Sequence, residues 1–246
     1  MKRLIDILAS FFGLLLTSPL LLTFMYLVWR QDRHSPFYIA PRMGKNEQPF
    51  HMIKLRSMVK NADKSGVDST AADDMRITRV GHLIRKFKLD ELTQLMNVLK
   101  GDMSLVGPRP NVQRETDLYT TEEKKLLLLQ PGITDFSSIV FSDEGDILEG
   151  QDDPDIAYNQ LIRPGKSRLG LFYIENRSLG VDIQLIWLTV LAILSREKAL
   201  RGVSSLLGKL GADAELVQLA SRTQPLVATP PPGAINIVTN REGRVD

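Results

Sequence analysis

The feature that most constrains this chain is an uncharged, apolar run near its N-terminus. From Ile7 to Trp29, 23 consecutive residues carry no charge. At about 1.5 Å per residue, a helix of this length extends roughly 35 Å, which is enough to cross the hydrocarbon core of a bilayer. The run is too long for the apolar part of a secretory signal peptide, and no A-x-A cleavage pattern follows it. The sequence therefore predicts a membrane-embedded helix.

The path of this helix through the membrane has two interpretations. Basic residues flank both ends of the run, namely Lys2, Arg3, Arg30 and Arg33. Because positive charge marks the cytoplasmic side of a membrane helix, this arrangement gives no orientation. Ser18-Pro19 lies at the middle, where proline bends the helix and the serine hydroxyl can satisfy the carbonyl that proline leaves free. A re-entrant helix and a kinked spanning helix both agree with the pattern.

The overall composition is that of an ordinary globular protein. Apolar residues make up 43% and charged residues 24% of the 246 residues, so we expect one folded unit with attachments. The net charge of +2, with basic residues scattered along the chain, argues against nucleic acid as a partner. The absence of cysteine excludes disulfides and thiolate nucleophiles, and three histidines are too few for a histidine-rich metal centre.

A strand-rich segment is predicted between residues 36 and 58. Its apolar runs are separated by a turn signal around Gly44-Lys45-Asn46. The period of two places Lys54 and Arg56 on one face and the apolar residues between and before them on the other, which predicts a paired cationic surface backed by core. Residues 60–75 are polar and lack periodicity, as is typical of a mobile loop that could close over a substrate.

A short amphipathic helix is predicted over residues 91–100. Its apolar positions follow helical spacing, at Leu92, Leu95, Met96 and Leu99, and Gly101 ends it. Asp90 and Glu91 stand at its N-terminus, in the positive field of the helix dipole and of three bases just upstream, Arg85, Lys86 and Lys88. An ionised aspartate in this place is a competent nucleophile toward phosphorus, although a simple helix cap is the alternative.

The residues around this pair suggest phosphate chemistry. The second carboxylate could hold Mg²⁺, which would offset the repulsion between an anionic nucleophile and an anionic diphosphate. After the helix, Gly107-Pro108-Arg109-Pro110 forms a stiff turn in which two prolines fix the backbone around one arginine. Such a turn suits a guanidinium that must meet a phosphate at a set angle.

The C-terminal part carries fewer chemical signals. Residues 141–155 contain seven acids and no base but lack calcium-loop spacing, so we expect a solvated acidic loop. Residues 183–194 are apolar around most of a helix, so they either pack in the core, which is favoured, or lie at the membrane surface. An amphipathic stretch follows to about residue 219, and residues 223–246 form a proline-rich segment that is predicted to be disordered.

Three stretches together resemble the bacterial sugar transferases known as monotopic phosphoglycosyl transferases. They are KLRSM at 54–58, LDELTQLMNVLKGDMSLVGPRP at 89–110 and QPGIT at 130–134, and the resemblance runs from about residue 1 to 195. It implies a mixed α/β fold with a re-entrant membrane helix at 1–33 and a small catalytic domain at 34–200, rich in amphipathic helices with a short strand-rich element. A C-terminal helix and tail at 201–246 lie outside it. The enzyme would then sit on the cytoplasmic face of a bacterial inner membrane.

The same resemblance implies a reaction and its residues. Asp90 would attack the sugar-linked phosphate of a UDP-sugar, release UMP and pass the phospho-sugar to a polyprenyl phosphate such as undecaprenyl phosphate, with Glu91 and Mg²⁺ assisting. Both carboxylates would hold the metal. Matching substrate-binding positions are Lys54, Arg56, Arg85, Pro108, Arg109 and Asp182, and Tyr173 and Ser178 resemble a further family segment. This would be the first membrane step in making an exopolysaccharide, lipopolysaccharide O-antigen, capsule or protein-linked glycan.

The sequence also departs from the family pattern. Many relatives continue PGIT with Gly-Trp and Ala-Gln, whereas here Asp135, Phe136, Ser137 and Ser138 follow, and an acidic insertion covers about 141–168. The identity of the sugar is therefore open, as are a homodimer and contacts with downstream glycosyltransferases. A catalytically silent, membrane-tethered scaffold is the alternative function, and the intact Asp90-Glu91 pair argues against it. A nucleotide-sugar hydrolase would use the same covalent step with water as acceptor.

Overall fold

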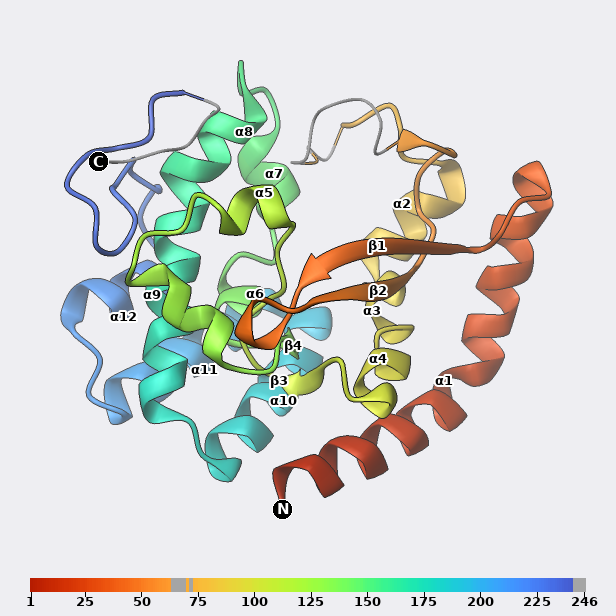
Figure 1. Ribbon diagram of the computed structural model, residues 1–246, viewed down its shortest axis with the longest axis horizontal. Helices are drawn as coiled ribbons and strands as arrows, with labels where there is room; N and C mark the ends of the chain where they lie inside the picture. The colour runs from red at the N-terminus through yellow and green to blue at the C-terminus, as the bar shows by residue number, and fades with distance from the viewer. Residues whose placement is uncertain (63–69, 71–72, 241–246) are drawn as a thin grey trace.

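A computed structural model describes residues 1–62, 70 and 73–240, and its first element is the apolar helix α1 (Lys2–Asp32). Among the described residues, α1 is the one helix long and apolar enough to cross a membrane. Figure 1 shows its two halves running in different directions. Pro19 lies inside the helix, and the Ser18 Oγ donates 2.8 Å to the Leu15 carbonyl, the acceptor that the missing proline N–H would have used. The predicted role of Ser18 is confirmed.

The predicted strand-rich segment is an antiparallel hairpin of β1 (Phe37–Met43) and β2 (Pro49–Leu55). The short 3₁₀ turn η1 (Lys45–Glu47) joins them, with Asn46 in the left-handed region at φ 55°. Figure 1 shows the hairpin between α1 on one side and the C-terminal helices on the other. The burial pattern is not strictly alternating, because the neighbouring Met52 and Ile53 are both buried. The predicted loop at 60–75 lies mostly outside the described residues.

The predicted helix at 91–100 is divided into two. After α2 (Arg79–Lys86), α3 covers Leu89–Leu92 and α4 covers Leu95–Lys100. The break falls at Thr93, whose hydroxyl donates 3.0 Å to the carbonyl of Asp90 and 3.0 Å to that of Ile53 in β2. Gly101 ends α4 at φ 100°, as predicted.

Two short parallel strands connect this region to the helical part of the molecule. They are β3 (Ser104–Val106) and β4 (Gly132–Thr134), with Ser104 opposite Gly132 and Val106 opposite Thr134. Between them lie α5 (Gln113–Thr116) and the 3₁₀ helix η3 (Glu123–Leu128). The mixed helix-and-sheet fold class is therefore confirmed.

The largest core cluster lies among the C-terminal helices. These are α6 (Phe136–Val140), α7 (Glu144–Leu148), α8 (Pro154–Ala157), the π-helical turn η4 (Tyr158–Ile162), α9 (Arg163–Asn176), α10 (Leu179–Leu194), α11 (Arg196–Lys209) and α12 (Ala214–Ser221). Fully buried side chains from α6, α9, α10 and α11 meet in it. The helices beyond residue 196 thus share a core with the helices before it.

Three expectations for this C-terminal part need correction or completion. The predicted solvated acidic loop is wrong for residues 144–148 and 154–157, which are helices, and for Asp143 and Glu144, which are paired with bases; residues 149–152 between the helices are exposed and irregular, as predicted. One face of α10 is buried through Leu185, whereas Trp187 on another face is 66% exposed, so this helix is not fully enclosed in the core. The predicted disorder is wrong for residues 223–240, since Val238 is buried and its carbonyl accepts 2.6 Å from Gln160 Nε2.

Candidate functional site

The two adjacent carboxylates lie on the four-residue helix α3, which begins directly after a residue in the left-handed backbone conformation. Lys88 adopts φ 54°, and this sharp turn ends the path of α2. Leu89 is buried with Val28 of α1, Leu55 of β2 and Ile84 of α2, which fixes the helix in place. Lys88 occupies the cap position and no side chain caps α3, so the interpretation of Asp90 as a helix cap is wrong. The carboxylates of Asp90 and Glu91 are therefore available for other contacts.

Strand β2 is fastened to α3 and α4 in a way that brings Lys54 to Asp90. Thr93 binds the Ile53 carbonyl, and Asn97 completes the attachment by accepting 2.9 Å from Ile53 N and donating 2.7 Å to His51 O. Lys54 is the next residue on β2, and its Nζ lies 3.4 Å from Asp90 Oδ2. The predicted cationic strand residue therefore meets the predicted nucleophile.

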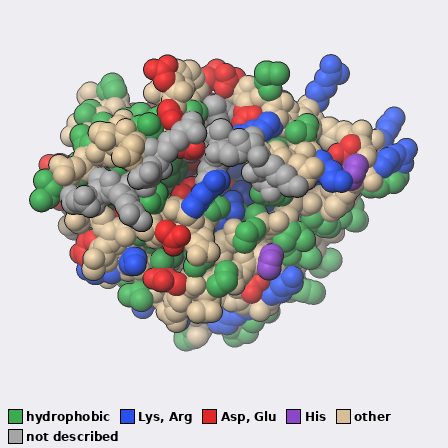
Figure 2. Space-filling view, turned by 45° about the horizontal axis from the view of Figure 1, so that its top comes forward, with side chains coloured by type: hydrophobic (Ala, Val, Ile, Leu, Met, Phe, Trp, Pro, Cys, Tyr) green, Lys and Arg blue, Asp and Glu red, His purple; other side chains and the backbone are tan. Residues whose placement is uncertain are grey.

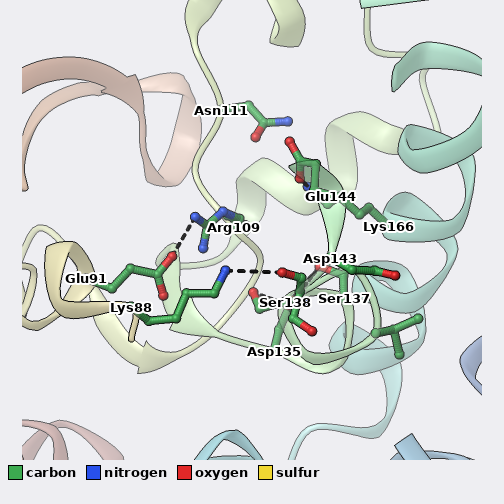
Figure 3. A network of polar contacts seen from close by, with 12 residues as sticks. Lys88, Glu91, Arg109, Asn111, Asp135, Ser137, Ser138, Asp143, Glu144 and Lys166 are labelled. Carbon is green, nitrogen blue, oxygen red and sulfur yellow. Dashed lines mark hydrogen bonds and ion pairs between the residues drawn. The ribbon is translucent and has the colours of Figure 1, made fainter. Parts of the chain in front are cut away.

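The turn that carries Arg109 rests against the QPGIT segment through two glycines. Gly107 N donates 3.0 Å to Thr134 O, and Gly132 N donates 2.9 Å to Pro108 O. A Cβ on either glycine would overlap the backbone of the other segment, so neither position accepts a side chain in this arrangement. The two motifs form one structural unit, and Arg109 projects from it to Glu91, with NH2 2.7 Å from Oε1 (Figure 3).

The ionisable side chains of the site shift one another's pKa values. Burial raises the pKa of Glu91, but Arg109, Lys88 and Lys54 outweigh burial and hold that pKa at about 2. The same ion pair with Glu91 raises the pKa of Arg109, while burial lowers the pKa of Lys54 despite the nearby Asp90. Glu91 is therefore an anion at neutral pH, set among three bases.

A second group of polar residues borders Arg109 from the far side, and the sequence did not identify it as part of the site. A cavity of about 30 Å³ beside Arg109 is lined by Asn111, Tyr119, Asp135, Tyr158 and Lys166, among others. Lys166 makes an ion pair with Glu144, and Figure 3 shows both above Arg109. The departure from the family pattern at 135–138 and the acidic insertion were the available signals, since both segments border this cavity.

Asp135 is buried at the bottom of this group. Its carboxylate accepts hydrogen bonds from the Ser137 hydroxyl at 2.8 Å and from the Ser138 backbone N–H at 2.7 Å. Burial raises the pKa of Asp135 in spite of these donors. Figure 2 shows basic and acidic side chains side by side at the centre of the face that it presents.

The other predicted site residues have different surroundings. Arg56 makes a bidentate ion pair with Asp32 at the end of α1, at 2.5 and 2.7 Å. Asp182 is buried and binds Lys2 Nζ at 2.5 Å and the Tyr173 hydroxyl at 2.6 Å. Ser178 caps α10, and Arg85 lies half-buried on α2. Substrate binding by Arg56, Arg85, Pro108 and Asp182 stays a prediction.

A divalent cation is compatible with the carboxylate pair. Among the residues that the structure describes, no three acidic or histidine side chains gather into a metal cage. Mg²⁺ is commonly held by one or two carboxylates together with substrate phosphates, so Asp90 and Glu91 supply a suitable oxygen donor set. For a metal ion to bind there, Lys54 and Arg109 would have to give up part of their contacts with the two carboxylates.

Comparisons with known proteins show the family to which the chain belongs. A family model described as "Bacterial sugar transferase" matches residues 1–196. The chain is similar to the UDP-N-acetylgalactosamine-undecaprenyl-phosphate N-acetylgalactosaminephosphotransferase of Aeromonas hydrophila, with 35% identity over 79% of this chain and 44% of the relative. It is also similar to the exopolysaccharide production protein ExoY of Sinorhizobium fredii, at 35% identity over 78% of this chain and 84% of that protein.

A third relative is the undecaprenyl-phosphate galactose phosphotransferase of Salmonella typhimurium, which is 35% identical over 81% of this chain and 41% of its own length. The chain therefore spans less than half of two of these relatives and most of the third. The family match covers the apolar helix, the carboxylate pair, the Arg109 turn and α10. The resemblance to bacterial sugar transferases is confirmed, and the chain belongs to that family.

Proposed function

We propose that this protein transfers a sugar 1-phosphate from a UDP-sugar to a polyprenyl phosphate and releases UMP. The observation that carries the proposal is the pair of adjacent carboxylates, each in contact with a base from a separate segment: Asp90 with Lys54, and Glu91 with Arg109. The two bases can bind the anionic oxygens of a diphosphate substrate, and the two carboxylates supply a nucleophile and a metal ligand. The names of two relatives include undecaprenyl phosphate, which supports the choice of acceptor.

The reaction would proceed in two displacements at one phosphorus. In the first, an Asp90 carboxylate oxygen attacks the phosphorus bonded to the sugar, and the bond from that phosphorus to the UMP oxygen breaks. In the second, an oxygen of the polyprenyl phosphate attacks the same phosphorus and the bond to Asp90 breaks. The aspartate is regenerated, and the lipid carries a sugar linked through a diphosphate.

The basic residues would exchange partners when the donor binds. Lys54 and Arg109 neutralise the carboxylates in the structure, and phosphate oxygens would take over as their partners. This exchange frees Asp90 for attack and Glu91 for a metal ion. Mg²⁺, if bound by Asp90 and Glu91, would stabilise the negative charge that develops on the phosphate oxygens.

The covalent intermediate gives the most direct test. Wild-type protein incubated with a UDP-sugar panel and no lipid should gain the mass of one phospho-sugar, mapped to the peptide that contains Asp90. Asp90→Asn should fold normally and lose UMP release by about 10⁴-fold, as is typical when a nucleophile is removed. Full turnover in this variant, or an adduct on another peptide, contradicts the mechanism.

The same assay separates the two other functions. A scaffold without catalysis would release no UMP with any donor of the panel. A hydrolase would release UMP at the same rate with and without polyprenyl phosphate, whereas the transferase should depend on the acceptor for steady turnover. Identification of the lipid product with the preferred donor would also indicate which kind of glycoconjugate is made.

We further propose that α1 is re-entrant and holds the rest of the chain on the cytoplasmic face of the inner membrane. The bend in α1, the satisfied Leu15 carbonyl and the basic residues at both ends support this path. A cysteine introduced at position 2 should resist a membrane-impermeant reagent in intact cells and react after the inner membrane is opened. Labelling in intact cells contradicts the re-entrant path.

A further inference from the structure

Two arginines from the C-terminal helices hold the short connection between α6 and α7. Arg196 is the first residue of α11, and its NH2 lies 2.8 Å from Asp143 Oδ2. Arg222 directly follows α12, and its NH2 lies 3.1 Å from the same oxygen. We call these three residues, Arg196, Arg222 and Asp143, the arginine clamp. Asp143 and Arg222 are mostly shielded from solvent, so water screens this contact less than it screens an exposed ion pair.

The clamp also binds the backbone and side chains around Asp143. Arg196 donates 3.2 Å to the Val140 carbonyl and 3.2 Å to the Ser142 hydroxyl. The Arg222 guanidinium lies over the ring of buried Phe141, with its carbon 5.4 Å from the ring centre. The whole connection from 140 to 143 is therefore fixed by groups from α11 and from the end of α12.

The held connection faces the candidate site. The Ser142 carbonyl accepts 3.4 Å from Lys88 Nζ, the base two residues before Asp90. Glu144, directly after Asp143, makes the ion pair with Lys166 at the cavity beside Arg109. Figure 3 shows Lys88 and Arg109 reaching toward the segment that carries Asp143 and Glu144. We call Lys88, Glu144 and Lys166 the rim of the site.

Arg222 ends α12 in a backbone conformation that glycine usually supplies at this position. It adopts φ 52° and ψ 31°, in the left-handed region that non-glycine residues rarely occupy. Such conformations persist where the surroundings over-determine them. Glycine is the residue that most often follows a helix in this conformation. Here the position holds an arginine, whose side chain makes the ion pair with Asp143.

We propose that Arg222, within the C-terminal extension (residues 197–240), and Arg196, directly before it, are positioning residues that together set the rim of the donor site. The family match ends at residue 196, so Arg222 and the rest of the extension lie outside the matched region, whereas Arg196 is its last residue. The inference rests on the proposed function. Because the clamp places binding groups and does not touch the nucleophile, its loss should weaken donor binding more than it slows the chemical step.

Arg222→Gln in the full chain tests this, because glutamine keeps a similar length and loses the charge. We expect KM for the preferred UDP-sugar to rise about tenfold while kcat changes less than about twofold. The matched control is Arg168→Gln, which removes ion pairs with Asp213, the N-cap residue of α12, and with Glu215 in its first turn, at the opposite end of α12 from Arg222. The control should leave KM unchanged, and Arg222→Lys should recover part of the wild-type KM.

Hydrogen–deuterium exchange provides a readout that does not depend on turnover. In Arg222→Gln, amides of residues 141–149 should exchange faster than in wild type, and in Arg168→Gln they should not. Unchanged exchange in this segment, or a wild-type KM in an active Arg222→Gln enzyme, overturns the inference. Absence of UMP release by the wild type would instead overturn the proposed function, and the exchange result would still decide whether the clamp holds the segment.

Discussion

Two arginine–glutamate pairs in this molecule have the same chemistry and opposite surroundings. In the helical part, Arg163 meets Glu123 through two hydrogen bonds of 2.6 and 3.0 Å, and the two side chains are 5% and 0% exposed. The Ser167 hydroxyl also donates to Glu123. In the site, Arg109 meets Glu91 through one hydrogen bond of 2.7 Å, and the side chains are 30% and 18% exposed.

The difference separates a pair that maintains the fold from a pair that can exchange partners. The inner pair is bidentate and almost closed to water. Arg163 also donates to the Asn159 side chain and the Leu118 carbonyl, and Glu123 also accepts from Ser167, so the polar groups of both members are already occupied within the fold. The site pair uses one donor of a guanidinium that has five, and its side chains are 30% and 18% exposed. The cavity does not distinguish the two pairs, because Arg163 lines it together with Arg109. Removal of the first should therefore act on stability alone, whereas removal of the second should act on activity and, to a smaller and pH-dependent extent, on stability.

The largest effect that we expect is on stability, from Glu123→Gln. The change leaves Arg163 buried without its counter-charge, and removing one partner of a buried pair costs about 3–5 kcal/mol of unfolding free energy. Thermal or chemical denaturation of the solubilised protein would measure it. The neighbouring Glu122→Gln is a matched control, because Glu122 pairs with Lys125 at the surface and should change stability by less than about 1 kcal/mol. Equal effects of the two substitutions would contradict the comparison.

The second effect concerns the pH dependence of the site pair. The pKa of Glu91 is about 2 in the folded protein against 4.5 normally, so ionised Glu91 stabilises the fold above pH 4.5, and this contribution disappears as pH falls toward 2. A shift of this size corresponds to at most about 3 kcal/mol. The unfolding free energies of wild type and Glu91→Gln should therefore converge between pH 6 and pH 3. A difference that stays constant over this range would show that Glu91 has an ordinary pKa.

The third effect, on activity alone, is that of Arg109→Lys. The ammonium group keeps the charge but cannot reproduce a bidentate contact with phosphate, so kcat/KM should fall about 30-fold, which corresponds to about 2 kcal/mol. The unfolding free energy should change much less than in Glu123→Gln. Unchanged kcat/KM would show that Arg109 does not contact the substrate. The site pair would then be a structural pair like Arg163 and Glu123.

The sequence predicted those parts of the site in which neighbours along the chain decide the structure. The hairpin, the position of the carboxylates, the end of α4 at Gly101 and the stiff Arg109 turn all depend on local spacing. The division at Thr93 was missed, and the Thr93 hydroxyl there binds the Ile53 carbonyl, 40 residues away. The helix pattern in 91–100 contains no sign of that partner.

Long-range pairing of charges explains the remaining differences. The acids of 141–155 have the composition of a solvated loop, and only the folded chain brings Arg196 and Arg222 to Asp143. Asp182 resembles a family position, but its partner Lys2 lies 180 residues away at the start of the membrane helix. Composition cannot show whether a charged residue faces water or a distant counter-charge.

The attachment of α1 to β3 has a consequence for how the protein sits in lipid. Asp6 accepts 2.8 Å from the Ser104 hydroxyl and 3.2 Å from Leu105 N, while Lys2 donates 3.1 Å to Val106 O. Every residue of β3 is therefore held by the first turns of α1, and Arg109 follows three residues later. Since each helical residue turns the chain by about 100°, one residue inserted after Asp6 would rotate the apolar remainder by that angle about its axis. The catalytic part thus specifies which side of the helix faces lipid, in addition to anchoring it there.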